Sequence, residues 1–174
     1  DGPGIEGSDI IGLTLAGDAD CDGAVDSVDA LQVLRFVAGL GEPDCLAAAD
    51  YLAAMPGIQA DRIGILGASY GAYLAYCALA YDPRHRFACG VAKYGDINIA
   101  TSWAQTARPV REDQERMMST PAAGRQAYRA GSPIWQVENI QKPLLIVHGL
   151  LDRTVHPYQS EELVEALDRA GKIY

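Results

Sequence analysis

Histidine, phenylalanine and long apolar runs are scarce in this sequence. Among 174 residues there are three histidines and two phenylalanines, so a reaction that needs a histidine base has only His85, His148 and His156 available. No stretch approaches the roughly 18 consecutive apolar residues of a membrane-spanning helix, and the first residues are not typical of a signal peptide. We therefore expect no membrane partner, and we interpret a chain that begins with Asp1 as a mature protein or a fragment.

Basic residues are nearly absent from the first 50 positions. These positions hold eleven of the 23 acidic residues but only one of the 14 basic residues, and the formal net charge of the chain is −9. Because a surface of this sign repels phosphate groups, nucleic acid is not expected as a partner. The acidity is concentrated in the amino-terminal segment, which indicates a separate role for that segment.

The four cysteines show no Cys-x-x-Cys spacing, so zinc binding and thioredoxin-like redox chemistry are not supported. Cys77 and Cys89 lie in apolar surroundings and are expected in the core. Cys21 and Cys45 fall in the acidic segment, where a disulfide between them would form only in an oxidising compartment. The spacing leaves that disulfide open.

An aspartate-rich stretch follows residues 1–16, which are predicted to be a linker. From Asp18 to Asp29 aspartates stand at loop positions 1, 3, 5, 9 and 12 with a glycine at position 6, the pattern of a calcium loop. The predicted ligands are five carboxylates and one backbone carbonyl: Asp18, Asp20, Asp22, Ala24, Asp26 and Asp29. The alternative is a solvated acidic turn, which five carboxylates in register with the glycine disfavour.

The segment from Gly17 to Leu40 resembles one repeat of a type I dockerin, a calcium loop followed by a helix. The resemblance implies a structural calcium ion, an extracellular or cell-envelope location, and a cohesin partner that Ser27 and Val28 would help to recognise. Dockerins pack two such repeats together, whereas no second loop follows Tyr51. We therefore expect residues 17–44 to form half of a dockerin-like module, with an EF-hand-like loop and helix.

The stretch Gly67-Ala68-Ser69-Tyr70-Gly71 lies between two predicted elements. The apolar run Arg62 to Leu66 predicts a strand, and the run that ends near Tyr81 predicts a helix. In a Gly-x-Ser-x-Gly turn between strand and helix the serine hydroxyl is exposed at the carboxyl end of the strand, with the N–H of Tyr70 available to an oxyanion. The alternative is an ordinary glycine-rich turn with a buried serine.

Further strands are predicted over Phe87 to Val91 and Pro143 to His148, and helices over Cys45 to Met55 and near Leu163. Strands that alternate with helices predict an α/β fold with a parallel sheet. Helical pieces are expected between residues 97 and 140, above the carboxyl edge of the sheet where ligands bind in such folds. The large side chains there either contact a ligand or simply pack: Trp103, Met117, Met118, Tyr128 and Trp135.

The last predicted strand leads into His148-Gly149-Leu150-Leu151-Asp152. An acid on a loop after a strand downstream of the serine turn is where α/β-hydrolases keep the carboxylate that orients their histidine. Asp152 fits this role, and the alternative for it is a surface or helix-capping aspartate.

Three motifs occur in order after Leu46: Asp61-Arg62-Ile63-Gly64 before the serine turn, Ser132-Pro133-Ile134, and the run from Lys142 to Gly149 before Asp152. With these motifs, about three quarters of the chain resembles the catalytic domain of the prolyl oligopeptidase family of serine peptidases. The resemblance implies that Ser69 is the nucleophile, Tyr70 supplies an oxyanion N–H, Asp152 is the triad acid and His148 is structural. It also implies that the base follows one further strand, which would begin where this chain stops.

We therefore expect residues 45–174 to form a partial α/β-hydrolase sheet with flanking helices. The predicted activity is hydrolysis of a peptide or ester through an acyl-enzyme on Ser69, absent from the isolated chain because the catalytic histidine is missing. A carboxylesterase is one alternative, and a cytoplasmic location is open for the hydrolase part alone. The other alternative is a secreted calcium-dependent binding module joined to a non-catalytic hydrolase-like scaffold.

Overall fold

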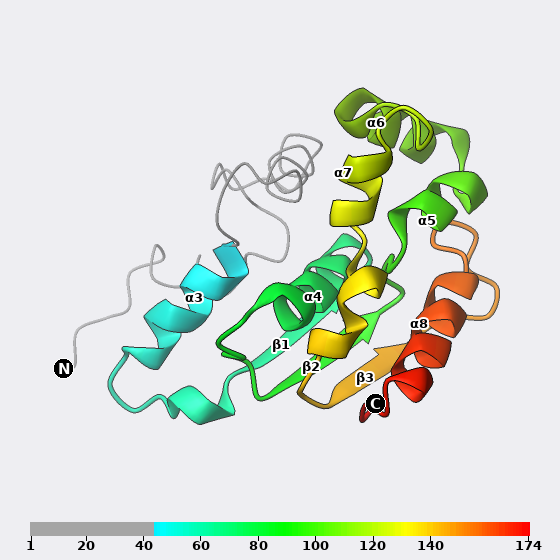
Figure 1. Ribbon diagram of the computed structural model, residues 1–174. Helices are drawn as coiled ribbons and strands as arrows, with labels where there is room; N and C mark the ends of the chain where they lie inside the picture. The colour runs from blue at the N-terminus through cyan, green and yellow to red at the C-terminus, as the bar shows by residue number, and fades with distance from the viewer. Residues whose placement is uncertain (1–43) are drawn as a thin grey trace.

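The computed structural model describes residues 44–174 (Figure 1). The predicted linker, the calcium loop and the dockerin-like half module lie outside the described residues, as do Cys21 and the predicted ligands Asp18, Asp20, Asp22, Ala24, Asp26 and Asp29. Within residues 44–174, no helix is long and apolar enough to cross a membrane.

Helices and strands alternate through most of the described chain. In order they are α3 (Asp44–Ala53), η2 (Ala60–Arg62), β1 (Gly64–Ala68), α4 (Tyr70–Tyr81), β2 (Cys89–Lys93), α5 (Ile99–Gln105), α6 (Arg108–Met118), α7 (Arg125–Ala130), η3 (Pro133–Asn139), β3 (Leu144–Val147) and α8 (Tyr158–Arg169). The strands pair in the order β1-β2-β3, and both pairings are parallel. The predicted parallel sheet with flanking helices is thus confirmed.

Two predicted strands are displaced by two residues. β1 was expected over 62–66 and β2 over 87–91, but they occupy Gly64–Ala68 and Cys89–Lys93. Arg62 ends a turn of 3₁₀-helix instead, and Phe87 is buried ahead of its strand. Backbone pairing decides the ends of both strands, because they stay in register up to Ala68 and Lys93.

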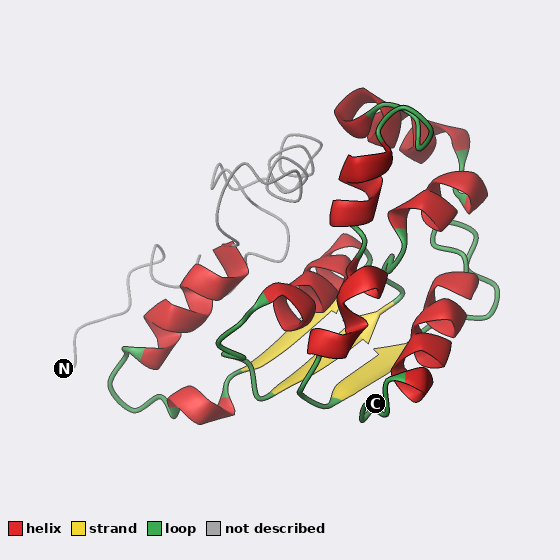
Figure 2. Ribbon diagram, in the orientation of Figure 1, coloured by secondary structure: helices red, strands yellow, loops and turns green. Residues whose placement is uncertain are grey.

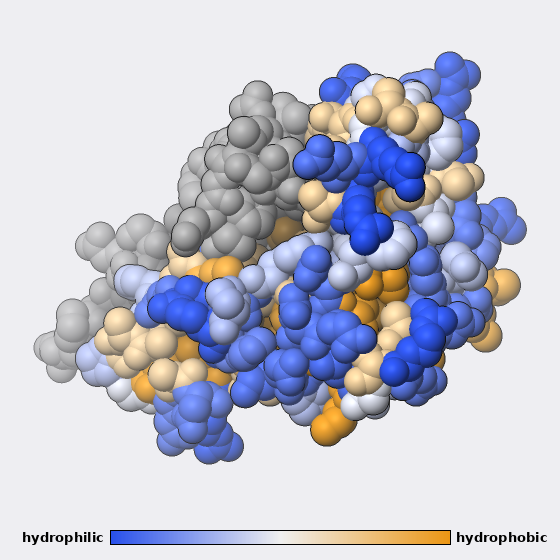
Figure 3. All heavy atoms as spheres, viewed as in Figure 1, coloured by the Kyte–Doolittle hydropathy of each residue, from blue (hydrophilic) through white to orange (hydrophobic). Residues whose placement is uncertain are grey.

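One face of the sheet packs against the helices. α4 lies over it with nine of its 12 residues buried, which explains why this helix is apolar on nearly all sides. Figure 2 shows α4 and η3 in front of the strands, and Figure 3 shows the same side with polar side chains over much of its surface. The core beneath includes Ala72, Tyr76, Ala92, Leu144 and Leu163.

The opposite face of the sheet is bare in the described part of the chain. Leu66, Val91 and Leu145 are in register across the three strands, and Leu66 and Leu145 are 67% and 57% exposed. Parallel sheets are ordinarily covered on both faces. Cys89 begins β2 on this same bare face, so it is exposed and the prediction that placed it in the core is wrong, whereas Cys77 is buried as expected.

Cys45 carries a free thiol at the start of α3. It packs against the main core, and burial is the chief cause of its raised pKa. Because Cys21 lies outside the described residues, the structure does not test a disulfide between Cys21 and Cys45, and that pairing stays open.

A second, smaller core joins α4 to the helices above the carboxyl edge of the sheet. It contains Tyr73, Cys77, Ile99, Met118 and Tyr128. The hydroxyl of Tyr73 donates a hydrogen bond of 2.8 Å to the carbonyl of Gly131. Met118 and Tyr128 therefore have packing roles, which was the simpler of the two interpretations.

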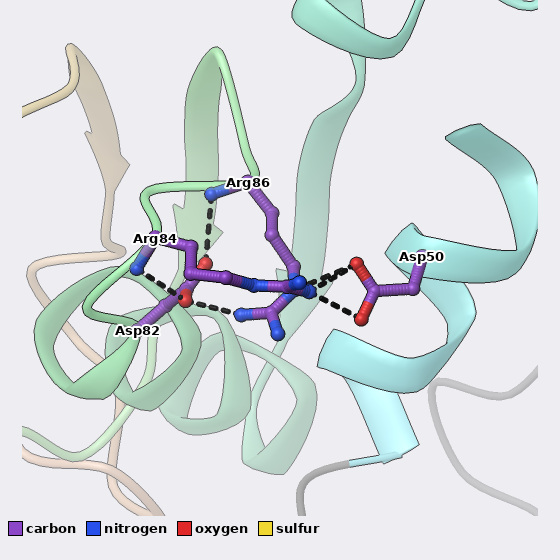
Figure 4. A network of polar contacts seen from close by, with 4 residues as sticks. All are labelled: Asp50, Asp82, Arg84 and Arg86. Carbon is purple, nitrogen blue, oxygen red and sulfur yellow. Dashed lines mark hydrogen bonds and ion pairs between the residues drawn. The ribbon is translucent and has the colours of Figure 1, made fainter. Parts of the chain in front are cut away.

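A polar network ties α3 to the loop that follows α4 (Figure 4). The side chain of Asp82 is fully buried and accepts hydrogen bonds from the backbone N–H of Arg84 at 2.9 Å and of Arg86 at 2.7 Å. The guanidinium of Arg86 contacts both Asp82 and Asp50, and Arg84 also pairs with Asp50. The network braces the turn that leads into β2.

The end of the chain runs beside the outer edge of β3. Gly171 adopts a positive φ of 62°, which ends α8, and the N–H of Leu144 then donates to the carbonyl of Ile173 at 3.3 Å. Ile173 therefore begins to pair with β3, at the place where a further strand was expected to start.

Candidate active site

Ser69 lies between β1 and α4 in a strained backbone conformation. Its φ is 53° and its ψ is −120°, a region that residues other than glycine rarely occupy. Such strain costs about 1–3 kcal/mol and persists where the surrounding structure imposes it. The side chain is exposed and does not cap α4, so its hydroxyl is left for another partner.

The two glycines that flank the serine explain how the turn is held. A Cβ on Gly67 would lie 2.0 Å from the carbonyl oxygen of Gly71 and 2.7 Å from the backbone nitrogen of Ala72. The end of β1 and the first turn of α4 are therefore in direct backbone contact, which only glycine permits.

Backbone hydrogen bonds beyond the strands tie the three strand ends together. The N–H of Ser69 donates to the carbonyl of Lys93 at 2.8 Å, and the N–H of Tyr94 donates to the carbonyl of Val147 at 2.7 Å. The loops after β1, β2 and β3 thus share one edge. Ser69 follows β1 and His148 follows β3, so two inter-strand spacings, about 10 Å in total, separate their backbones. The end of β2 runs between them.

Tyr70 is the first residue of α4, so its N–H has no acceptor within the helix and points from the positive end of the helix dipole. Its ring packs on Tyr73 with a centroid distance of 5.3 Å. Burial strongly raises the pKa of the Tyr70 phenol, so the phenol stays neutral. The contribution that Tyr70 can make to an oxyanion therefore comes from its backbone.

Asp152 lies on the loop between β3 and α8, at the same edge as Ser69. Its Oδ1 accepts hydrogen bonds from the backbone N–H of Thr154 at 2.8 Å and of Val155 at 3.0 Å. These donors fix the orientation of the carboxylate. Its Oδ2 lies 3.8 Å from Nε2 of His148, and the side chain is partly exposed.

His148 is occupied on both ring nitrogens. Its Nε2 lies 2.9 Å from the carbonyl oxygen of Val155, which can only accept, so Nε2 carries the proton. Its Nδ1 then accepts from the hydroxyl of Ser160 at 2.6 Å. An imidazole that is hydrogen-bonded at both ring nitrogens braces the loop and is not free to act as a base.

Neither of the other two histidines is hydrogen-bonded to Ser69 or Asp152 in the described part of the chain. His85 follows α4, whose 12 residues span about 18 Å, so it lies toward the opposite edge of the sheet from Ser69. His156 lies on the acid-bearing loop, is exposed, and accepts from the N–H of Tyr158 at Nδ1 over 3.2 Å. The sequence has no fourth histidine. Ser69 and Asp152 thus share an edge on which no histidine bridges them.

Asp96 is a further titratable residue at this edge, and the sequence reasoning missed it. It follows β2, and its Oδ1 is buried with no hydrogen-bond partner in the described part of the chain. Burial raises the pKa of Asp96, the Ser102 hydroxyl and His148 oppose that rise, and the charge of Asp152 adds to it. Its position five residues after the predicted strand Phe87 to Val91 was the signal that could have found it.

No group of three or more His, Cys, Asp or Glu side chains that could hold a metal ion occurs among residues 44–174. Around Asp152 the surface forms an open cleft of about 530 Å³, lined by Leu150, Leu151, Asp152, Arg153, His156, Pro157 and Glu161.

Comparison with protein-family models decides the classification, because the model of the prolyl oligopeptidase family matches residues 41–174. The chain belongs to this family. A relative from Mus musculus, inactive dipeptidyl peptidase 10, is 31% identical over 160 residues, which cover 88% of this chain and 19% of the relative. Dipeptidyl aminopeptidase BIII of Pseudoxanthomonas mexicana is 33% identical over 116 residues, covering 62% of this chain and 16% of the relative.

Solved structures agree with the family assignment. Acylaminoacyl peptidase of Pyrococcus horikoshii superposes with a TM-score of 0.72 at 29% identity, over 87% of this chain and 24% of that protein. Dipeptidyl peptidase 4 of Porphyromonas gingivalis gives a TM-score of 0.66 at 31% identity, over 74% of this chain and 17% of that protein. The chain thus spans about a fifth of the length of the relatives that it matches.

Proposed function

We propose that this chain carries the nucleophile and acid of a serine peptidase catalytic domain. Ser69 attacks the carbonyl carbon of a peptide or ester, and the N–H of Tyr70 donates to the oxyanion of the tetrahedral intermediate. The C–N or C–O bond then breaks, and the amine or alcohol leaves with the proton that came from the serine, which gives the acyl-enzyme. Asp152 holds the histidine that removes the serine proton. Water then releases the acyl group.

The backbone of Ser69 is the single observation that carries this proposal. A non-glycine residue at φ 53°, exposed and without a capping role, is held there by direct contact between Gly67 and Gly71. Backbone strain of this kind is concentrated at functional sites. In acyl-transfer enzymes, a strained turn exposes the serine hydroxyl at the carboxyl edge of the sheet.

The base is the missing component. Because His148 is engaged at both nitrogens and His85 lies toward the opposite edge, we expect the isolated 174-residue chain to hydrolyse neither peptides nor esters. The same serine should become reactive when an imidazole is supplied from solution, since Ser69 is exposed and Asp152 follows a strand of the same sheet at the same edge.

The test is imidazole-dependent acylation. The chain is mixed with p-nitrophenyl acetate at increasing imidazole concentrations, and the acetylated protein is quantified and located by peptide mass spectrometry. We expect acetyl to accumulate on Ser69 only when imidazole is present. Ser69→Ala should abolish it at every imidazole concentration.

Ser119→Ala is the matched control, because Ser119 is an exposed serine that also has a positive φ, 64°. It should acylate like the unchanged chain. Label on Ser69 that does not depend on imidazole would show that His156 or His85 serves as the base, and absence of label at all concentrations would reject Ser69 as the nucleophile. Parallel assays with a p-nitroanilide separate a peptidase from a carboxylesterase.

A non-catalytic scaffold is the second candidate, and the name of one relative favours it: the Mus musculus protein is an inactive dipeptidyl peptidase. In that case the hydrolase-like part only supports the amino-terminal segment. Calcium binding by that segment, a cohesin partner and an extracellular or cell-envelope location stay predictions. Calorimetric titration with calcium, and its loss in Asp20→Ala and Asp22→Ala, tests the first of them.

A further inference from the structure

Two consecutive polar side chains are buried at the start of α8. Gln159 is 0% exposed and Ser160 is 9% exposed, on a helix whose opposite side faces solvent. Buried polar groups cost free energy unless they are hydrogen-bonded. The hydrogen-bond partners of these two residues therefore show which segments α8 is attached to.

Gln159 fastens α8 to the loop that follows β2. Its Oε1 accepts from the backbone N–H of Ile97 and of Asn98, each at 3.0 Å, and its Nε2 donates to Oγ1 of Thr101 at 2.8 Å. Three hydrogen bonds therefore run from one side chain to a single short segment, and two of them go to buried backbone amides. This segment begins directly after Asp96 and leads into α5.

Glu162, one turn further along α8, extends the same attachment. Its Oε1 accepts from Nδ2 of Asn98 at 2.8 Å, and its Oε2 accepts from Oγ1 of Thr101 at 3.1 Å. The charge of Glu162 therefore meets two donors from the loop that Gln159 holds. The first turns of α8 and the loop after β2 form one connected unit.

Ser160 fastens α8 to the end of β3 instead. Its hydroxyl donates to Nδ1 of His148 at 2.6 Å, and Nε2 of His148 donates in turn to the carbonyl of Val155 at 2.9 Å. His148 precedes the loop that bears Asp152, and Val155 lies near the end of that loop. The His148 imidazole therefore connects the two ends of the loop, and the Ser160 hydroxyl connects the loop to α8.

Strand pairing alone does not position this loop. Leu150 and Leu151 are 85% and 90% exposed, so the segment that leads to Asp152 has no apolar anchor of its own. The donors to the Asp152 carboxylate, Thr154 and Val155, belong to the loop itself. Outside the loop, the Ser160 hydroxyl of α8 bonds to His148, and the Thr106 hydroxyl donates to the carbonyl of Thr154 at 3.3 Å.

We infer that Gln159 and Ser160 are positioning residues for Asp152: together they set where the carboxylate stands relative to Ser69. This inference rests on the proposed function, in which Asp152 is the acid. The strand order agrees with it, because the loop held by Gln159 follows β2 and the loop held by Ser160 follows β3, and these two strands are neighbours in the sheet.

The experiment compares Gln159→Met, which keeps the side-chain length but removes all three hydrogen bonds, with Ser160→Ala and its conservative partner Ser160→Thr. Gln114→Met is the control, since Gln114 is a buried glutamine on α6 and not on α8. Amide hydrogen exchange is followed by NMR in the full chain at Thr154 and Val155, the donors to Asp152, and in α4 as a reference for global opening.

Gln159→Met and Ser160→Ala should each lower the protection of Thr154 and Val155 about tenfold relative to α4, the scale of one lost hydrogen bond. Ser160→Thr should restore it, and Gln114→Met should leave it unchanged. Unchanged protection, or a fall no larger than that in α4, would overturn the inference. If Gln159→Met fails to fold, the two Ser160 variants decide.

Imidazole-dependent acylation separates this inference from the proposed function. Variants that misplace Asp152 should still be acylated at Ser69, but they should need a higher imidazole concentration to reach half of the maximal rate. Ser69→Ala should carry no acetyl label at position 69 at any imidazole concentration. If Ser69 is never acylated, the proposed function is wrong. The hydrogen exchange of Thr154 and Val155 then still tests whether Gln159 and Ser160 position Asp152. If acylation occurs and its imidazole dependence is identical in every Ser160 variant, the positioning role fails alone.

Discussion

Replacing Gly67 by alanine tests whether the close contact between β1 and α4 shapes the turn at Ser69. A Cβ there would lie 2.0 Å from the carbonyl oxygen and 2.2 Å from the carbonyl carbon of Gly71, and real Cβ contacts are essentially never below 3.0 Å. In Gly67→Ala, α4 must therefore move away from β1 by at least 1.0 Å, the difference between 3.0 and 2.0 Å. The obstacle is backbone on both sides, so no side chain can rotate away to relieve it.

The expected loss of stability is about 3 kcal/mol, the upper part of the range for overpacking in a well-packed core. For a chain of this size that lowers the Tm by roughly 6–12 °C. Imidazole-dependent acylation of Ser69 should fall by about 100-fold, the effect of a 1 Å misplacement of a reacting group. Urea and thermal unfolding followed by circular dichroism, together with the acylation rate, measure both quantities.

Gly149→Ala is the matched control on the same edge of the sheet. A Cβ at Gly149 meets nothing within 4 Å and its φ is not in the left-handed region, so its Tm should stay within experimental error of the unchanged chain. If Gly67→Ala unfolds at the same temperature as Gly149→Ala and Ser69 still acylates at the original rate, the close contact between β1 and α4 is not what shapes the turn.

Three further outcomes follow from the buried groups. Burial raises the pKa of Asp96 above 3.8, so the folded state favours the neutral carboxyl group. The stability that this group contributes is complete below pH 3.8 and is lost as the pH rises through the folded-state pKa. Asp96→Asn should therefore have a higher urea midpoint than the unchanged chain, by an amount that grows between pH 4 and 7. Asp82→Ala should cost about 3 kcal/mol in urea unfolding because it leaves two backbone N–H groups and a guanidinium without their buried acceptor, whereas Asp50→Ala, on the exposed side of the network, should cost far less. Since burial raises the pKa of Cys77 to about 12, a thiol reagent at pH 8 should label the exposed Cys89 at once and Cys77 only after denaturant is added.

Local patterns predicted the serine turn and the alternation of elements well, because both depend on short-range constraints. The glycines beside Ser69 and the apolar run before it are adjacent in sequence, so the turn could be located to the residue. The ends of β1 and β2 were misplaced by two residues because pairing between strands, which no single segment specifies, extends them to Ala68 and Lys93.

The supports of the site could not be found in this way. Nothing in the sequence around Gln159 distinguishes a fully buried amide from a surface one, and its partners Ile97 and Asn98 lie about sixty residues earlier. The position of Asp96 after a predicted strand was visible in the sequence, but its burial and its electrostatic interaction with His148 and Asp152 depend on the fold. The two ring partners of His148 likewise depend on how α8 returns to the edge of the sheet.

The bare face of the sheet affects how strongly this chain self-associates in solution. Leu66 and Leu145, in register through Val91, offer an apolar strip on which each leucine gains about 1.5–3 kcal/mol when it is covered. Attraction of this kind strengthens on warming from low temperature and in sulfate or phosphate salts, and it weakens on cooling. Light scattering should therefore rise with temperature well below the unfolding transition, and cold chloride buffers should keep the protein dispersed.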